Sequence, residues 1–361
     1  MNKTAISLLI SMAALSLGAD AAVVYTDNDG SDLAVIGRLG ADFNNRTTDD
    51  IKGSFDARIG VKGRQKIDNQ FSLIGLAQYQ VNAAEYANSL RRDSNGNLVE
   101  RGDNLVARYV WVGIDGNELG KVTFGRVSSG LISMTDVADI FAAASFITGR
   151  QASRVDPTAV QIVRQDATIQ YSNIFNNIEF STAYILGNGS SDLDYGYNTL
   201  LSYTFDFAEM GRLVPVVAYQ QTMADHQEGS IINNDAQKYR FGGAGARYYV
   251  GDFIIGALYS SDSVSYADEE SSRDDVLESN VTYNINSYFT TRVGYRHLEN
   301  DGGGDMALRD YLFELQYKLT PFSSIYTTYV IRNGRDGSAG QNTFGHSNDD
   351  DIYHLGLRYD F

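Results

Sequence analysis

The sequence predicts an all-β fold: a 16-stranded antiparallel transmembrane β-barrel made by one chain of 361 residues. Three observations predict it. Stretches of about ten residues alternate apolar and polar side chains along most of the chain. No apolar run after the N-terminal segment reaches the roughly 20 residues that a transmembrane helix needs. The composition, with 35 Gly, 24 Tyr, 3 Pro and no Cys, favours strands and tight turns and excludes a disulfide framework.

The N-terminal segment has the features of a secretory signal peptide rather than of the fold. Lys3 is followed by an apolar run from Ala5 to Leu17 and by the small residues of Gly18-Ala19-Asp20-Ala21. A basic start, a short apolar stretch and a small-x-small ending predict cleavage after Ala21. A buried N-terminal helix is the alternative, and the small-residue ending disfavours it. We therefore expect a signal peptide at residues 1–21 and an exported barrel domain at residues 22–361.

The strand-like segments carry apolar residues on one face and charged residues on the other. In the second segment Phe55, Ala57, Ile59 and Val61 alternate with Asp56, Arg58 and Lys62. Other segments repeat the pattern: Leu33, Val35, Leu39 and Phe43 against Arg38 and Asp42; Leu105, Ala107, Tyr109 and Trp111 against Arg108; Ala167, Ile169 and Tyr171 against Arg164, Asp166, Thr168 and Gln170; Tyr353, Leu355, Leu357, Tyr359 and Phe361 against His354, Arg358 and Asp360. A charge at a strand centre is costly toward lipid and stable toward water, so we expect a hydrated interior.

Sixteen such segments can be counted, and the connections between them alternate short and long. The expected strand centres are residues 38, 58, 77, 109, 123, 168, 182, 201, 217, 243, 257, 280, 292, 313, 327 and 356. The long connections are residues 87–103, 127–163, 223–236, 262–272, 299–306 and 333–348. Barrels of this kind have short turns at the periplasmic end and longer loops outside, and at this strand count the lumen holds water.

Composition and motifs also narrow the function. A formal net charge of −16 disfavours a nucleic-acid partner, because an acidic chain repels phosphate. The four histidines lack the Ser and acid spacing of a hydrolase site, so we expect no enzyme activity and no catalytic residues. We also expect no metal site, because the acidic run Asp349-Asp350-Asp351 lacks the spacing of an EF-hand. We expect no cofactor, since the glycine-rich segments lack the Lys-Ser/Thr partner of a phosphate-binding loop.

Several segments, in this order and spacing, resemble one family. They are Ala22-Val23-Val24-Tyr25 through Asp29-Gly30 to Ile36-Gly37-Arg38, then Ala57-Arg58-Ile59-Gly60-Val61-Lys62-Gly63, Arg108-Tyr109-Val110-Trp111-Val112-Gly113, Gly120-Lys121-Val122-Thr123-Phe124-Gly125-Arg126, and the terminal Phe361. Together they are similar to the strands of general diffusion porins of Gram-negative bacterial outer membranes. The likeness spans residues 22–361 and is strongest over residues 22–171 and in the last strand.

The resemblance implies a homotrimer of barrels, each narrowed by an inward-folded third loop. The basic wall of the pore constriction would be Arg38, Arg58, Lys62, Arg108 and Arg164. The acidic residues of the constriction loop would be Asp136 and Asp139. The loop departs from the family pattern, since Asp139-Ile140-Phe141-Ala142-Ala143 stands in place of Pro-Glu-Phe-Gly-Gly, and Arg150 and Arg154 would reduce its acidity. Tyr359 and Phe361 would form the signal that the barrel-assembly machinery reads.

The resemblance further implies a porin of the cell outer membrane, a water-filled channel for passive diffusion of ions and small hydrophilic solutes. Its partners would be lipopolysaccharide and outer-membrane lipid, the assembly machinery and two further copies of the chain. Two alternatives remain: a substrate-specific, sugar-type channel, which needs aromatic residues along the lumen, and a structural or adhesive barrel. Acidic rims predict a weak cation preference at low salt that shrinks toward neutral at high salt.

Overall fold

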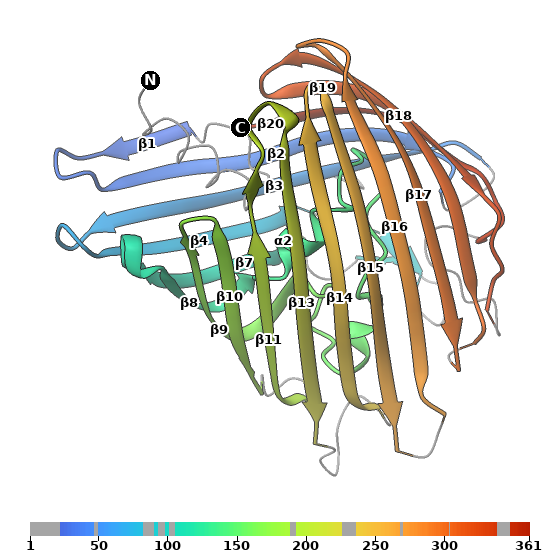
Figure 1. Cartoon of the computed structure of the whole chain (residues 1–361), viewed down its shortest axis with the longest axis horizontal. Coiled ribbons are helices and arrows are strands. Elements are labelled where there is room, and N and C mark those ends of the chain that lie inside the picture. The colour runs from blue at the N-terminus through green and yellow to red at the C-terminus, as the bar shows by residue number, and fades with distance from the viewer. Residues whose placement is uncertain are drawn as a thin grey trace.

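The computed structural model shows one closed wall of long antiparallel strands (Figure 1). It describes residues 22–46, 50–81, 90–92, 98–100, 105–187, 193–225, 236–267, 270–302, 304–337 and 347–361. The expected signal peptide, residues 1–21, lies outside these residues, as do parts of five expected loops: 87–103, 223–236, 262–272, 299–306 and 333–348. Within the described residues, no helix has the length and apolar character needed to cross a membrane.

The described wall consists of sixteen strands of eight residues or more, with two short strands at its edges. In chain order the elements are β1 (Ala22–Thr26), β2 (Asp32–Asn44), β3 (Lys52–Lys66), β4 (Ser72–Val81), β5 (Leu90–Arg92), β6 (Leu98–Glu100), β7 (Leu105–Asp115), η2 (Asn117–Leu119), β8 (Lys121–Ser128), α2 (Ile132–Thr135), η3 (Arg150–Arg154), β9 (Arg164–Phe175), β10 (Ile178–Leu186), β11 (Leu193–Tyr203), β12 (Phe205–Asp206), η4 (Ala208–Met210), β13 (Arg212–Ala224), β14 (Ala236–Val250), β15 (Phe253–Tyr266), β16 (Ser272–Asn284), β17 (Phe289–Asp301), β18 (Ala307–Thr320), β19 (Ser323–Arg332) and β20 (Ile352–Asp360).

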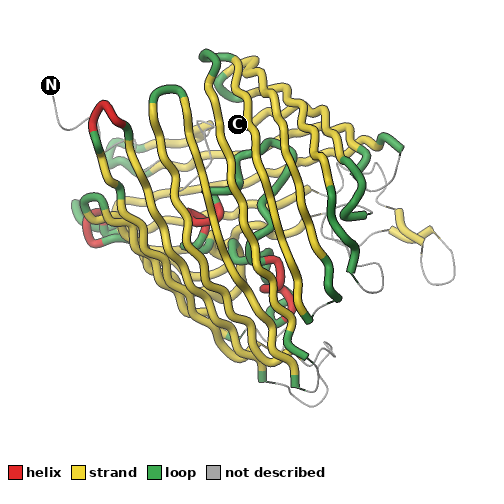
Figure 2. Tube along the Cα trace, turned by 45° about the vertical axis from the view of Figure 1, so that its right-hand side comes forward, coloured by secondary structure: helices red, strands yellow, loops and turns green. Residues whose placement is uncertain are grey.

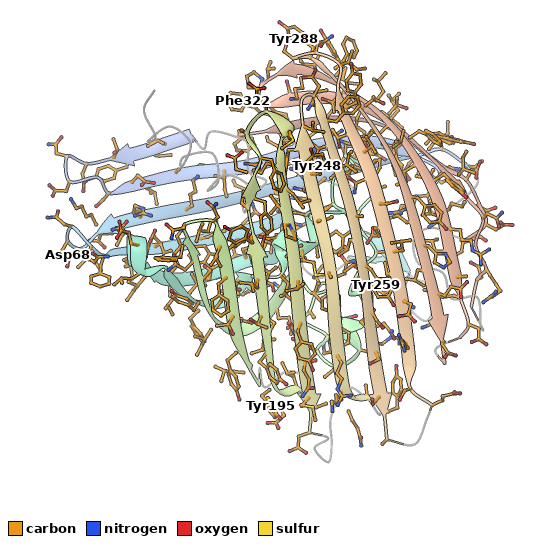
Figure 3. All side chains as sticks on the ribbon, in the orientation of Figure 1. Asp68, Tyr195, Tyr248, Tyr259, Tyr288 and Phe322 are labelled. Carbon is orange, nitrogen blue, oxygen red and sulfur yellow. The ribbon has the colours of Figure 1, made fainter. Side chains whose placement is uncertain are left out.

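The expected strand count is confirmed. Each of the sixteen expected centres falls in a different long strand. Tight connections join β9 to β10, β14 to β15 and β18 to β19, each across about two residues. In Figure 3, Tyr288 and Phe322 mark the rim with the tight turns, and Tyr195 lies at the opposite rim.

The expected alternation is also present on most strands. On β20, Leu355 and Leu357 are about half exposed on the outside, whereas His354 of the same strand is buried. On β19, Ile325 and Tyr329 point outward in the same way, and Thr328 is fully buried. The outer surface is thus a continuous apolar band, which is the surface that a lipid environment requires.

Strand β7 departs from this expectation. Tyr109 and Trp111 were expected on the lipid face, but both line the lumen, and Val110 and Val112 are exposed outside instead. The cause is a β-bulge: the register against β4 shifts between Gln78 and Tyr79, which leaves Arg108 as an extra residue. One extra residue in a strand reverses the faces of all the residues that follow it.

The barrel closes where the two ends of the chain share one edge of β2. β20 pairs with residues Arg38–Asn44 of β2, and β1 pairs with Asp32–Val35 further along the same edge. The terminal Phe361 donates its N–H to the Gly37 carbonyl and accepts the Gly37 N–H, at 3.0 and 2.6 Å. Its ring covers Gly37, where a β-carbon would overlap the ring at 2.3 Å. The last residue therefore completes the ring of main-chain hydrogen bonds, which leaves no free strand edge here.

The third loop, residues 127–163, runs inside the barrel, as expected. Figures 1 and 2 both show α2 and η3 enclosed by the strands rather than outside them. Carboxylates on the wall hold the loop through its backbone: Glu314 accepts the Ala142 N–H at 2.7 Å, and Glu278 accepts the N–H groups of Ile147 and Thr148 at 3.1 and 3.2 Å. Gly294 leaves room for the Phe141 ring, because a β-carbon there would lie 2.7 Å from it. These contacts fix the loop at mid-barrel.

Candidate functional site

A cavity of about 1210 Å³ lies between the third loop and the barrel wall. This exceeds the roughly 300–1,000 Å³ of typical small-molecule pockets. The wall contributes residues of β2, β3, β4, β7, β9, β17, β18, β19 and β20, and the loop contributes residues between Ser128 and Val163. The sequence-predicted residues Arg38, Arg58, Arg108, Arg164, Asp136 and Asp139 all line it. The loop and wall therefore bring opposite charges to one narrow part of the lumen.

Arg38 and Arg58 lie directly opposite each other in the β2/β3 pair. Like charges in this position repel, and each arginine has its own carboxylate that offsets the repulsion. Arg38 binds Asp360, and Arg58 binds Asp56 at 2.8 Å. The two guanidinium groups are therefore held along the wall by ion pairs with strand residues.

Arg108 and Arg164 have a different environment. Arg108 donates to the amide oxygens of Gln78 and Gln80, at 3.1 and 3.4 Å, and neither arginine forms an ion pair within the described part of the chain. Their guanidinium carbons lie 5.9 and 5.3 Å from the centroid of the Tyr109 ring. Both guanidinium groups are therefore within the range of cation–π contacts with this one ring.

Lys62 is the one expected wall residue that does not line this cavity. It lies on the inward row of β3, opposite Leu76 and four residues beyond Arg58. Arg358 does line the cavity and was not among the expected constriction residues. Its guanidinium donates to the Ala142 carbonyl of the loop at 2.6 Å. The sequence pattern could have indicated Arg358, because it lies on the inward row of the last strand. Closure of the barrel places that strand beside β2, which carries Arg38.

The acidic side of the cavity comes from one helical turn of the loop. The Asp136 N–H donates to the Ile132 carbonyl and the Asp139 N–H to the Thr135 carbonyl, which places the two carboxylates three residues apart on one face. Asp139 is exposed to the cavity, although it occupies the position where the family pattern has proline. Burial raises the pKa of the Asp136 carboxyl to about 7; Arg247 opposes this shift, and Asp139 and Glu179 add to it.

The loop arginines do not neutralise this acidic face. Arg150 forms an ion pair with Asp274 of β16 at 2.7 Å, and neither Arg150 nor Arg154 lines the cavity. Asp166, expected on the lumen face of β9, instead pairs with Arg126 at 2.6 Å where the β8/β9 register shifts, and it does not line the cavity either. Fewer charged residues therefore face the cavity than the strand alternation and the loop sequence indicate.

Comparison with known proteins identifies the family. The family described as Gram-negative porin matches residues 9–337. The chain belongs to the Gram-negative porin family. The porin is 25% identical to porin-like protein L of Photobacterium profundum and 25% identical to outer membrane protein U of Vibrio parahaemolyticus, with both chains covered completely in each case.

Solved structures share its fold. A Salmonella typhi OmpF in complex with daunomycin matches with a TM-score of 0.69 at 16% identity, over 94% of the porin and 100% of that chain. A trimer form of OmpT of Vibrio cholerae matches with a TM-score of 0.67 at 14% identity, over 92% and 99%. Family and fold together indicate an outer-membrane channel for passive diffusion rather than an enzyme.

Proposed function

We propose that ions and small hydrophilic solutes cross this porin through the cavity between the wall arginines and the third loop, which acts as the constriction. The wall side comprises Arg38, Arg58, Arg108, Arg164 and the additional Arg358, and the loop side comprises Asp136 and Asp139. The observation that carries the proposal is that both sets line the same cavity. Opposed charges across a narrow, hydrated passage act on every ion that passes, because water screens them least there.

The charge balance of this passage differs from that of the whole chain. Among the described residues that line the cavity, eight are Arg or Lys and five are Asp, which leaves a formal charge of +3 against −16 for the chain. The acidic rims attract cations at low salt, and a Debye length of about 3 Å at 1 M removes that influence. We therefore infer a weak cation preference at low salt that gives way to an anion preference at high salt.

The test is the reversal potential of the purified porin in a planar bilayer under a salt gradient, repeated from about 0.05 M to about 1 M. The proposal requires conductance and a reversal potential that moves toward anions as salt rises. Absence of conductance would contradict the proposal and favour a structural or adhesive barrel. A cation preference that grew with salt would show that the acidic loop, rather than the arginines, controls the passage.

A sugar-type channel is the second candidate, and one observation favours it: Tyr109 and Trp111 line the lumen. Sugar rings stack on aromatic side chains, so such residues are what a sugar path needs. Phe141, Phe146 and Tyr326 also line the cavity, but they come from the loop and from β19 and do not continue the row of Tyr109 and Trp111 along β7. Maltose or glucose at millimolar concentration should therefore leave the ion current of a general diffusion channel unchanged.

We also propose the assembly and export steps. Cleavage after Ala21 would release residues 22–361, as N-terminal sequencing of the membrane protein can test. A homotrimer is supported by the apolar outer surface, and OmpT of Vibrio cholerae has been solved in a trimer form. Tyr359 and Phe361 would serve as the assembly signal for the barrel-assembly machinery, with their rings 5.7 Å apart on the outer face. Lipopolysaccharide and lipid would cover the remaining outer surface.

A further inference from the structure

Aromatic side chains lie on the lumen wall next to the constriction. The bulge at Arg108 turns Tyr109 and Trp111 into the lumen, and both line the cavity. Trp111 is the only tryptophan of the chain. Across β4, Leu76 is its paired neighbour and also lines the cavity. The wall therefore presents an apolar, partly aromatic surface to water at this point.

The loop adds apolar residues to the same cavity, among them Ile132, Val160 and Val163. Apolar surface in contact with water favours any solute that covers it. A purely hydrophilic passage would not need such a surface, and here it lies beside the two arginines that have no carboxylate partner.

These two arginines are available to an anion. Among the described residues, the Arg108 guanidinium donates hydrogen bonds only to neutral amides. The Arg164 guanidinium contacts the Tyr109 ring, and its buried Nε has no hydrogen-bond partner among these residues. Arg38 and Arg58, by contrast, are each paired with a carboxylate. Guanidinium groups bind carboxylates and sulfonates through charge-assisted hydrogen bonds. An incoming anion would displace no ion-paired carboxylate of the described residues at Arg108 or Arg164.

We propose that Arg108, Tyr109, Trp111 and Arg164 form a binding subsite for small aromatic anions, that is, single-ring carboxylates or sulfonates. The acid group lies at the two guanidinium groups, and the ring lies on Tyr109 and Trp111. An aromatic cation is repelled by the arginines, and an aliphatic anion gains the charge contact without the ring contact. The proposal rests on the proposed function, because it names a class of solute that the same passage retains.

The experiment measures how solutes block the current of the purified porin in a planar bilayer. The probes are phenylacetate, cyclohexylacetate as an anion of similar size without an aromatic ring, phenethylammonium as an aromatic cation, and glucose. We expect phenylacetate to block at a concentration about two- to ten-fold lower than cyclohexylacetate, which is the range of a favourable aromatic contact. Phenethylammonium and glucose should block least.

Matched variants separate the ring contact from the charge contact. Trp111→Leu and Tyr109→Leu should remove the preference for phenylacetate over cyclohexylacetate, with block measured relative to the open-channel current of each variant. Arg108→Gln with Arg164→Gln should weaken block by both anions. Tyr184→Leu is the control, because this tyrosine is 47% exposed on the outer face, and it should change nothing.

The fluorescence of Trp111 gives an independent measurement, since Trp111 is the only tryptophan and excitation at the red edge of its absorption avoids the 24 tyrosines. Saturable quenching by phenylacetate in detergent, lost in Arg108→Gln with Arg164→Gln, supports the subsite. Equal block by phenylacetate and cyclohexylacetate in a conducting channel would overturn it, as would tighter block by glucose, which would indicate a sugar subsite. Absence of any conductance would instead overturn the proposed function, and the fluorescence titration would still decide the subsite.

Discussion

Removing the two loop carboxylates one at a time tests the constriction most sharply, because burial raises the pKa of both and brings that of Asp136 to about 7. Asp136→Asn and Asp139→Asn each replace a carboxylate by an amide of nearly the same shape. Burial raises the pKa of Asp136 to about 7, so this group is neutral well below that pH and charged well above it. Both residues lie in the loop, outside the spanning strands, and both line the cavity.

The size of the effect follows from Coulomb's law with screening. An ion about 8 Å from a carboxylate gains about 0.5 kcal/mol in water, and salt at about 0.15 M reduces this to about 0.2 kcal/mol. Loss of one carboxylate charge makes the passage less favourable for a cation by about 0.2 kcal/mol and more favourable for an anion by about the same amount. The cation-to-anion permeability ratio therefore falls about two-fold per full charge. For Asp136→Asn the fall depends on pH. It is about 1.4-fold at about pH 7, where Asp136 is half ionised, about two-fold at pH 9, where it is charged, and almost none at pH 5, where it is neutral.

The assay is the reversal potential at about 0.15 M salt, measured for the parent porin and both variants from about pH 5 to pH 9. The parent should become more cation-preferring as the pH rises through about 7, because Asp136 then acquires its charge. Asp136→Asn should lack that step, and Asp139→Asn should retain it. The reasoning is refuted if Asp136→Asn keeps the step, or if either variant raises the cation preference.

The remaining predictions concern the wall, the loop and assembly. Arg58→Ser with Arg108→Ser should raise cation preference and admit bulkier solutes; a reversal potential that moves toward anions would show that the wall has been misplaced. Glu278→Ala should free the loop backbone and increase current fluctuations several-fold, whereas the exposed control Glu299→Ala should not; identical noise in both would mean that Glu278 does not hold the loop. Phe361→Ala should slow assembly and leave conductance unchanged, and normal outer-membrane levels of the variant would count against its proposed role. The unheated porin should run on a denaturing gel as an oligomer that heat dissociates, since closed main-chain hydrogen bonding resists denaturant; a monomer under mild extraction would exclude the trimer.

The periodicity of the sequence was sufficient to place the strands. A two-residue alternation needs only neighbouring residues to be read, and the sharp difference between lipid and water enforces it on almost every strand. Arg38, Arg58, Arg108 and Arg164 were expected in the lumen for this reason, and the structure brings all four to one cavity. The motif resemblance added the inward course of the third loop.

A bulge cannot be read from alternation, because it consists of one residue that breaks it. Tyr109 and Trp111 follow the bulge at Arg108, so their expected face was the wrong one, and the aromatic surface of the lumen became visible only with the register of β4 and β7. Lys62 shows a second limit: it has the right parity, but its height along the barrel keeps it out of the cavity.

By itself, therefore, the sequence determined the strand number, the two faces of most strands and the wet interior, since these depend on local patterns and on solvent. Only the tertiary structure decided what meets across the lumen. Glu278 accepts hydrogen bonds from loop residues about 130 positions away, and Arg358 contacts the Ala142 carbonyl 216 positions away. Such contacts depend on how the ring closes and on how far the loop reaches, and neither is encoded in any single segment.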